Sequence, residues 1–158
     1  LPGDGVDAST RQKLFEETLG TGHYWLYDHF GSLDSDNLLN KLRFMVHGCD
    51  CRWLILDHLS IVVSGLDPDE DERRAIDRTM TRLRQFTEET EVGLVLVSHL
   101  KRPNGQGHED GAVTSLAQLR GSAAIAQLSD IVVGLERNQQ AEDEDERNCT
   151  ALRVLKNR

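Results

Sequence analysis

Apolar residues recur along the chain every three to four positions in several stretches, which is the spacing of one face of an α-helix. The longest of these stretches has an apolar stripe that includes Ile76, Leu83 and Phe86, and charged residues fill most of its other positions. That pattern is typical of a helix with one buried and one solvated face. The helices predicted in this way span residues 9–19, 35–47, 69–90 and 121–129.

Short continuous apolar runs separate these helices, and such runs are typical of strands that are buried on both faces. The strands predicted from them span residues 23–27, 52–56, 92–97, 131–135 and 150–155, with a further apolar piece at 60–64. Strands that alternate with helices at this spacing favour an α/β fold, in which helices flank a mainly parallel sheet. The predicted loops span residues 65–69, 101–114 and 139–147. A loop as long as 101–114 is usually functional.

The composition is that of an ordinary soluble globular protein and changes this picture little. The 158 residues suit one domain, with 38% of them hydrophobic and 28% charged. No apolar run approaches the roughly 18 residues of a membrane span, and the N-terminus lacks the apolar region of a signal peptide. Because the chain starts at Leu1 without an initiator methionine and stops just after a strand-like run, we expect both ends to lie inside a longer protein.

The formal net charge of −9 argues at first against a nucleic-acid partner, since binding to phosphates requires lysine and arginine. The acidic residues are unevenly distributed, however. Six lie within 67–77 and five within 142–146, whereas residues 92–100 include none. Lys101 and Arg102 follow that acid-poor stretch directly. A local basic groove can therefore exist on a protein whose exterior is acidic.

The cysteines are Cys49, Cys51 and Cys149, an odd number at a spacing that fits neither a disulfide framework nor a zinc site. We therefore expect a reducing compartment. A redox or metal-binding pair at Cys49 and Cys51 is the alternative to an ordinary turn into the following strand, and the turn is the better interpretation.

Ionisable or polar residues follow every predicted strand. In an open parallel sheet, ligands bind beyond the carboxyl ends of the strands, so these residues are expected to share one edge of the sheet. They are Asp28 after the first strand, Asp57-His58 after the second, Ser98-His99 after the third, Glu136-Arg137 after the fourth, and Lys156-Asn157-Arg158 after the last. Five such endings in succession predict a binding site.

Asp57 has the most specific setting of these residues. The run Trp53–Leu56 before it makes a Walker B pattern, in which an apolar strand presents a carboxylate to the Mg²⁺ of a bound nucleotide. Mg²⁺ prefers oxygen ligands and retains several waters, so a single carboxylate can suffice. Three apolar residues and an aspartate also occur by chance, and an ordinary strand-end aspartate is the alternative.

His99 and the loop after it suit contacts with phosphates. The imidazole of His99 is a candidate sensor of a γ-phosphate that relays its presence into the loop, and a histidine bonded to backbone is the alternative. Lys101 and Arg102 begin a glycine-containing loop and are candidates for contact with a phosphate backbone. Two solvated surface charges are the alternative in their case.

The predicted helix after residue 119 offers a further anion site, because Arg120, Gly121 and Ser122 stand at its N-terminus. The alternative is an ordinary helix cap. For Gln127 within the same helix, the alternative to a functional role is an ordinary surface or interface position. No Gly-x-x-x-x-Gly-Lys-Ser/Thr motif is present in the 158 residues, so this chain lacks the main cradle for a triphosphate.

Seven sequence blocks resemble, in the same order, the helicase domain of the primase–helicases of short-tailed phages. The blocks are WLYDHF, LILDHLSIVVS, VSHLK, LRGS, QLSD, LERNQQ and LKNR. The resemblance runs from about Tyr24 to Arg158, and LILDHLSIVVS and LERNQQ are its specific blocks. The chain is more distantly similar to the mitochondrial Twinkle helicase and to bacterial DnaB.

The resemblance implies a nucleotide site that draws on several strand ends. Asp57 resembles the Walker B aspartate that positions Mg²⁺, and His99 matches a histidine that contacts the γ-phosphate. Arg120 and Gln127 match the last conserved helicase motif, which lies near nucleotide and DNA. The implied cofactor is Mg²⁺ with ATP or dTTP.

The resemblance also implies partners. Arg158 matches the arginine finger that completes the ATP site of a neighbouring subunit, and Lys156 lies beside it as a further catalytic residue. Lys101 and Arg102 match a channel loop that grips single-stranded DNA, and Arg137 matches another channel loop. The implied partners are therefore single-stranded DNA, a nucleoside triphosphate and further copies of the chain in a homo-hexamer, with no membrane.

The function implied by the resemblance is that of an ATP-dependent replicative DNA helicase that moves 5′ to 3′ in the cytoplasm of an infected bacterium. The 158 residues would be the C-terminal portion of its RecA-like core, without the P-loop strand and helix, and inactive alone. One alternative is a RecA-type recombination or clock-type ATPase. Another is a non-catalytic RecA-like interaction module, which the missing P-loop favours and the retained Asp57, His99 and Arg158 oppose.

Overall fold

The computed structural model describes residues 6–27, 35–64, 71–101, 107–119 and 123–158. The chain divides into two compact units, Leu1–Phe30 and Gly31–Arg158. Among the predicted features, Asp28, Arg102, Arg120, the helix start at Gly121-Ser122 and the loop at 65–69 lie outside the described residues.

The described part of the first unit holds one α-helix, α1 (Ala8–Glu17), close to the prediction of 9–19. Asp7 caps its N-terminus, because the Asp7 carboxylate accepts hydrogen bonds from the backbone N–H groups of Ser9 and Thr10 at 2.8 and 3.0 Å. The hydroxyl groups of Ser9 and Thr10 and these N–H groups hold the pKa of Asp7 well below its usual range. The helix therefore begins where its orphan N–H groups find an acceptor.

The predicted strand at 23–27 is wrong. A 3₁₀ helix (Leu19–Thr21) and Gly22, in the left-handed conformation at φ 75°, precede this stretch, which then runs as irregular structure. A strand requires a hydrogen-bonded neighbour, and the described part of this unit supplies none. Aromatic composition suggested the strand, yet Tyr24 and Trp25 are both 58% exposed.

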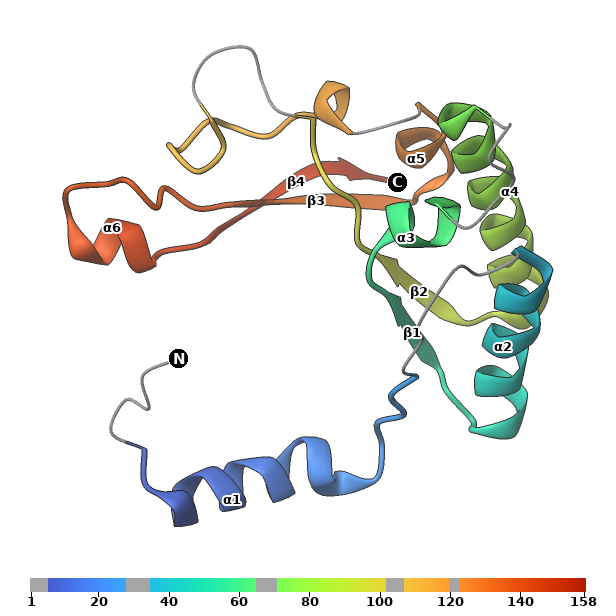
Figure 1. The fold of residues 1–158 in the computed structure, drawn as a ribbon, viewed down its shortest axis with the longest axis horizontal. Helices are drawn as coiled ribbons and strands as arrows, with labels where there is room; N and C mark the ends of the chain where they lie inside the picture. Colours follow the sequence, from blue (N-terminus) through green and yellow to red (C-terminus); the bar gives the residue numbers. More distant parts are fainter. Residues whose placement is uncertain (1–5, 28–34, 65–70, 102–106, 120–122) are drawn as a thin grey trace. The chain divides into compact units, whose positions relative to one another are not determined.

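The second unit is built from helices and strands that follow the predicted order (Figure 1). They are α2 (Ser35–Gly48), β1 (Trp53–Leu56), α3 (Leu59–Ser64), α4 (Glu72–Thr90), β2 (Gly93–Leu96), a 3₁₀ helix (Leu116–Gln118), α5 (Ala123–Leu128), β3 (Ile131–Glu136), α6 (Glu144–Asn148) and β4 (Ala151–Asn157). The apolar piece at 60–64 is helical, and the predicted loop at 139–147 holds most of α6. None of the helices that the structure describes is long and apolar enough to cross a membrane.

The strands form a small parallel pair and a separate antiparallel pair. β1 and β2 are parallel, with Trp53 opposite Gly93 and Leu56 opposite Leu96. Gly93 leaves room for the Trp53 ring, which a Cβ at that position would overlap. The prediction of one mainly parallel sheet is therefore confirmed only for β1 and β2.

β3 and β4 form a hairpin, which corrects the predicted parallel order of the last strand. Glu136 pairs with Ala151 and Ile131 with Asn157, so the two strands run in opposite directions. A parallel neighbour requires a crossover that spans the full length of the sheet, usually through a long helix. The connection here holds only the five-residue α6, which turns the chain back instead (Figure 1).

α4 organises the core of the second unit, and its predicted apolar stripe is buried. Asp71 caps its N-terminus, where the carboxylate accepts a hydrogen bond from the Arg73 N–H at 3.0 Å, and Glu91 follows its last residue as the C-cap. One buried cluster consists of Leu38, Leu39, Leu42, Leu54, Leu56, Val62, Leu83, Phe86 and Val92. A second consists of Leu59, Val63, Ala75, Ile76, Met80 and Ile125. Because α4 contributes to both, it joins α2 and the parallel pair to α3 and α5.

Replacing Phe86 with alanine should destabilise the protein by about 3–5 kcal/mol, because the change leaves a cavity in the larger cluster. Phe86 is only 1% exposed. Phe44→Ala is the matched control, since this ring on α2 is 67% exposed and its loss should cost no more than about 0.5 kcal/mol. Urea unfolding of the full-length protein measures both. Equal losses for the two variants would contradict this assignment of the core.

Candidate functional site

The carboxyl ends of β1 and β2 lie at one edge of the parallel pair. Val97 continues the pairing past the strands, because its N–H donates to the Leu56 carbonyl and its carbonyl accepts from the Leu59 N–H, both at 3.0 Å. The rings of His58 and His99 meet there edge to face, with centroids 4.3 Å apart. The structure therefore brings together the second and third of the predicted strand endings.

Asp57 stands at this edge, directly after β1, with an exposed side chain. Among the described contacts its carboxylate has no hydrogen-bond partner, so both oxygens are available to a cation. In the described parts of the chain, no group of three or more His, Cys, Asp or Glu side chains could hold a metal ion by itself. A hard cation that keeps several waters and shares phosphate ligands fits a single exposed carboxylate of this kind.

His58 is a further candidate site residue, to which the sequence reasoning gave no role. Its side chain is half-buried against His99, and its Nδ1 atom is buried without a hydrogen-bond partner among the described residues. The available signal was the doublet Asp57-His58 at the strand end, of which only the aspartate received a role. The ring contact limits the orientations that His99 can adopt, so His58 contributes to the geometry of the candidate phosphate sensor.

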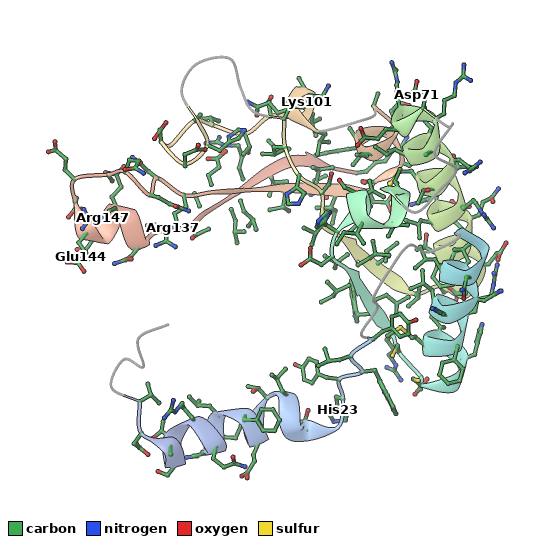
Figure 2. All side chains as sticks on the ribbon, in the orientation of Figure 1. His23, Asp71, Lys101, Arg137, Glu144 and Arg147 are labelled. Atoms are coloured by element: carbon green, nitrogen blue, oxygen red, sulfur yellow. The ribbon has the colours of Figure 1, made fainter. Side chains whose placement is uncertain are left out.

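Lys101 begins the predicted channel loop and has an exposed side chain (Figure 2). Leu100 forms an antiparallel bridge with Leu119, and the Lys101 N–H donates to the Gln118 carbonyl at 2.7 Å. The start of the loop therefore lies beside the chain that leads into α5. Arg102, the other cation predicted in this loop, and Arg120, predicted at the start of the next helix, lie outside the described residues.

Glu136 at the end of β3 is the centre of a polar network that the sequence reasoning did not find. Its carboxylate accepts hydrogen bonds from the backbone N–H and the hydroxyl of Thr114, both at 2.7 Å. Arg153 on β4 donates to the same carboxylate through Nε at 2.7 Å and through a terminal nitrogen at 3.1 Å. Arg153 foremost, and Thr114 next, lower the pKa of Glu136 to about 2. The carboxylate is therefore ionised throughout the physiological range.

The stabilisation from Glu136 should weaken in acid. The pKa of its carboxyl is about 2 in the folded chain and has an ordinary value of 4.5, so the contribution is present above pH 4.5 and is lost as the pH falls toward 2. We expect the stability difference between the wild type and Glu136→Gln to be smaller at pH 3 than at pH 7. Urea unfolding at the two pH values measures it, and a difference independent of pH would contradict the assigned network.

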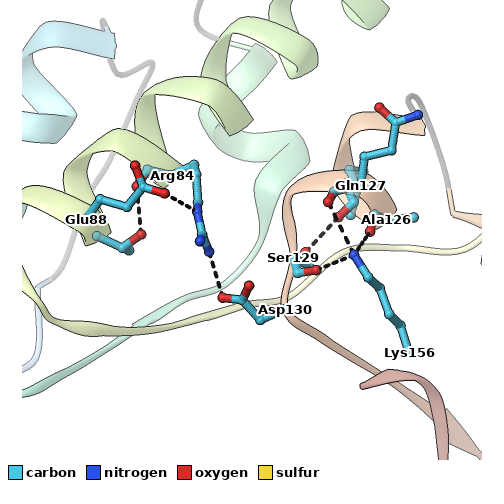
Figure 3. A network of polar contacts seen from close by, with 9 residues as sticks. Arg84, Glu88, Ala126, Gln127, Ser129, Asp130 and Lys156 are labelled. Atoms are coloured by element: carbon cyan, nitrogen blue, oxygen red, sulfur yellow. Dashed lines mark hydrogen bonds and ion pairs between the residues drawn. The ribbon is translucent and has the colours of Figure 1, made fainter. Parts of the chain in front are cut away.

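Lys156 binds the C-terminal end of α5 (Figure 3). Its Nζ donates to the carbonyls of Ala126 at 2.8 Å, Gln127 at 3.2 Å and Ser129 at 2.6 Å. The last carbonyls of a helix have no partner within the helix, and a cation there also interacts favourably with the helix dipole. The ammonium group of Lys156 thus caps α5, while the Gln127 side chain remains exposed.

Lys156→Met should destabilise the protein by about 1–3 kcal/mol, because methionine keeps the apolar stem but leaves three carbonyls without their donor. Lys13→Met is the matched control, since Lys13 on α1 is 74% exposed and its ion pair with Glu17 is a surface pair at 3.8 Å. Thermal unfolding compares the two variants. If Lys156→Met were no less stable than the control, the capping role would be wrong.

Asp130, between α5 and β3, links the end of the chain to α4. Its carbonyl accepts a hydrogen bond from the Arg158 backbone N–H at 3.1 Å. Its carboxylate pairs with the Arg84 guanidinium at 2.6 Å, and Arg84 also binds Glu88 one helical turn further along α4 (Figure 3). The backbone of Arg158 is therefore fixed, whereas its side chain is exposed.

Arg137 lies directly after β3, and its guanidinium binds residues in the connection from β3 to β4 (Figure 2). Its Nε donates to the Arg147 carbonyl at 2.6 Å, and a terminal nitrogen lies 3.4 Å from the Asn148 side-chain oxygen. The guanidinium therefore contacts the C-terminal end of α6. Its predicted role in binding DNA stays a prediction.

The five strand endings do not share one edge, which corrects that expectation. Asp57-His58 and Ser98-His99 do so, but Lys156-Asn157-Arg158 ends a strand that is antiparallel to β3. It therefore lies beside Asp130 at the start of β3, at the opposite end of the hairpin from Glu136-Arg137. The error arose because carboxyl ends meet only where strands are parallel.

Comparison with known proteins identifies the family. The model of the DnaB-like helicase C-terminal domain matches residues 9–158. The chain is also 46% identical over 143 residues to a DNA helicase/primase of Enterobacteria phage T3. That alignment covers 90% of this chain and 25% of the phage protein, so the chain spans about a quarter of this relative. The chain belongs to the DnaB-like helicase C-terminal domain family.

Proposed function

We propose that the chain is part of the motor of a replicative DNA helicase that couples hydrolysis of ATP or dTTP to movement along single-stranded DNA. Family membership and the phage relative support a helicase. The observation that carries the nucleotide site is the contact of His58 with His99 at 4.3 Å beside the exposed carboxylate of Asp57. The strand ending with Walker B character at Asp57 and the strand ending that carries the His99 imidazole thus meet at one edge.

Asp57 would hold the Mg²⁺ of the bound nucleotide, and His99 would contact its γ-phosphate. When bound, Mg²⁺ supplies neutralisation of the charge that develops on the phosphates during transfer. His58 holds the ring of His99 at this edge through their contact. Arg120 and Gln127 would lie near the nucleotide, and the Gln127 side chain on α5 is exposed.

Arg158 would complete the nucleotide site of a neighbouring subunit in a homo-hexamer. Its backbone is fixed by Asp130 and its guanidinium is exposed, which suits a group that must reach across an interface. Lys156 would act beside it by holding α5 and the end of β4 together through the three carbonyls that it binds. An arginine supplied by a neighbour couples hydrolysis at one site to the position of the next subunit.

Lys101, Arg102 and Arg137 would contact single-stranded DNA from two loops, and translocation would run 5′ to 3′. Lysine and arginine on loops suit the phosphate backbone, which offers charge without sequence information. The acidic residues 142–146 are exposed and would face away from the DNA.

The 158 residues contain no P-loop motif, so the complete motor would take its triphosphate cradle from a part of the protein outside this chain. The whole would be a RecA-like core that acts in the cytoplasm of an infected bacterium. Because such a cradle holds most of the phosphate contacts, the 158 residues alone should hydrolyse no nucleotide.

Unwinding of a forked DNA duplex by the full-length protein tests the proposal. The protein should separate the strands with ATP or dTTP and Mg²⁺, and only when a 5′ single-stranded tail is present. A fork with only a 3′ tail is the control for direction. Strand exchange between homologous duplexes without unwinding would favour a recombination ATPase instead. Neither activity, together with no nucleotide hydrolysis, would favour a non-catalytic module.

A further inference from the structure

Residues 107–115, here called the docked segment, belong mostly to the loop predicted at 101–114 and lie against the β3–β4 hairpin. The attachment near its C-terminal end is made by Thr114, which is only 3% exposed. Thr114 gives both its backbone N–H and its hydroxyl to the Glu136 carboxylate, each at 2.7 Å. A loop residue that is this deeply buried and doubly bonded is held in one position.

The Glu136 carboxylate is well suited to this attachment. Its side chain is only 12% exposed, and Arg153 holds its charge from the neighbouring strand at 2.7 Å. Hydrogen bonds to an ionised acceptor are about twice as strong as those between neutral groups. Glu136 therefore joins the docked segment to both strands of the hairpin.

Gly134 supplies the space that this attachment needs. It is buried in the middle of β3, and a Cβ at that position would overlap the Thr114 hydroxyl. A glycine inside a strand weakens the strand and often marks a close approach of another part of the backbone. Here the approaching part is the docked segment.

A second attachment fixes the other end of the docked segment. Asp110 forms an antiparallel bridge with Asn138, and the Gln139 N–H donates to the Glu109 carbonyl at 2.9 Å. Asn138 and Gln139 begin the connection from β3 to β4, directly after Arg137. The docked segment thus bonds to the strand end and to the start of the second loop.

We propose that Glu136 is a positioning residue that fixes the docked segment to β3, so that Lys101 and Arg137 move as one body. Lys101 is tied to this body because its N–H donates to the carbonyl of Gln118, which lies shortly after the docked segment. The proposal rests on the proposed function, in which Lys101 and Arg137 contact single-stranded DNA. A shift of either residue would then be transmitted to the other through Thr114 and Asn138, without contact between the two DNA-binding side chains themselves.

The functional test uses the full-length protein and its hydrolysis of ATP at increasing concentrations of single-stranded DNA. For Glu136→Gln we expect the DNA concentration at half-maximal stimulation to rise about tenfold, since charged hydrogen bonds to the segment are lost. The rate at saturating DNA should fall less than about threefold, because no group that contacts nucleotide is removed. Glu89→Gln is the matched control. Glu89 is an exposed residue of α4 that pairs with Arg43 of α2, and its replacement should leave both values unchanged.

Two further variants keep the test decisive if Glu136→Gln fails to fold. Thr114→Val removes only the hydroxyl, and Gly134→Ala pushes Thr114 away while retaining the Glu136 carboxylate. Each should raise the half-maximal DNA concentration. In the double variant Thr114→Val with Glu136→Gln, the fold increase in that concentration should be smaller than the product of the two single increases. Unchanged half-maximal concentrations in stable variants, or independent effects of the two changes, would overturn the proposal.

Hydrogen exchange separates this proposal from the proposed function. In the wild type the amides of Thr114 and Gln139 should be protected, since each donates an internal hydrogen bond. Glu136→Gln should speed exchange at both amides. Faster exchange at Thr114 alone would overturn the proposal that the docked segment and the start of the β3–β4 connection move as one body. If exchange rises at both amides while the wild-type protein neither unwinds DNA nor responds to it, the helicase proposal fails and the attachment stands.

Discussion

Replacing Arg158 with alanine in the full-length protein is expected to reduce multiple-turnover hydrolysis of ATP on single-stranded DNA by about 10³–10⁵-fold, the range associated with an arginine finger. The guanidinium would stabilise charge on the transferring phosphoryl group of the neighbouring subunit. Folding should be little affected, because the Arg158 side chain is exposed and the backbone N–H that binds Asp130 is retained.

Mixing two inactive variants tests whether the finger acts between subunits. In rings that combine Arg158→Ala with Asp57→Asn subunits, some interfaces join an intact Asp57 to an intact Arg158. Such rings should recover part of the hydrolysis that each variant lacks alone. Normal hydrolysis by Arg158→Ala alone would show that this arginine is not the finger. No recovery in mixed rings of confirmed composition would argue against a site shared between subunits.

Replacing Asp57 with asparagine should reduce hydrolysis by about 10²–10³-fold, because the metal loses its charged protein ligand and several kcal/mol of charge stabilisation. The substitution keeps the size of the side chain. The exposed carboxylate makes no hydrogen bond among the described residues, so stability should hardly change. Single-turnover hydrolysis over a range of Mg²⁺ concentrations measures the effect.

Asp50→Asn is the matched control for that variant. Asp50 is also exposed and lies just before β1, in the left-handed conformation at φ 53°, which asparagine adopts readily. Its hydrolysis should equal that of the wild type. If Asp57→Asn hydrolysed nucleotide at the wild-type rate at low Mg²⁺, the Walker B assignment of Asp57 would be wrong.

The sequence predicted most of the helices and strands of the second unit from their apolar patterns, and in the longest helix the apolar spacing records which positions become buried. The stripe through Ile76, Leu83 and Phe86 predicts α4 in this way, and all three side chains are buried. That Asp57 and His99 lie at the same edge of the parallel pair also followed from the sequence. Parallel strands must end at the same side, and the alternation of strand and helix predicted a parallel pair.

Only the tertiary structure decided which strands pair and what the polar side chains bind. A short apolar run does not by itself fix the direction in which a strand pairs, so the reversal at α6, which separates Lys156 from Glu136, could not be read from the runs. Residues 23–27 have the composition of a strand but lack a neighbour in the described unit.

The partners of individual charged groups were equally hidden from the sequence. The carbonyls that hold Lys156 lie 27 to 30 positions earlier in the chain, and Thr114 lies 22 positions before Glu136. Local periodicity extends over a few turns of helix or a single strand, whereas these bonds depend on packing between distant segments. The sequence by itself therefore determined the family resemblance, most elements of the second unit and the Asp57 edge, while the fold decided the two sheets, the cap on α5 and the attachment at Glu136.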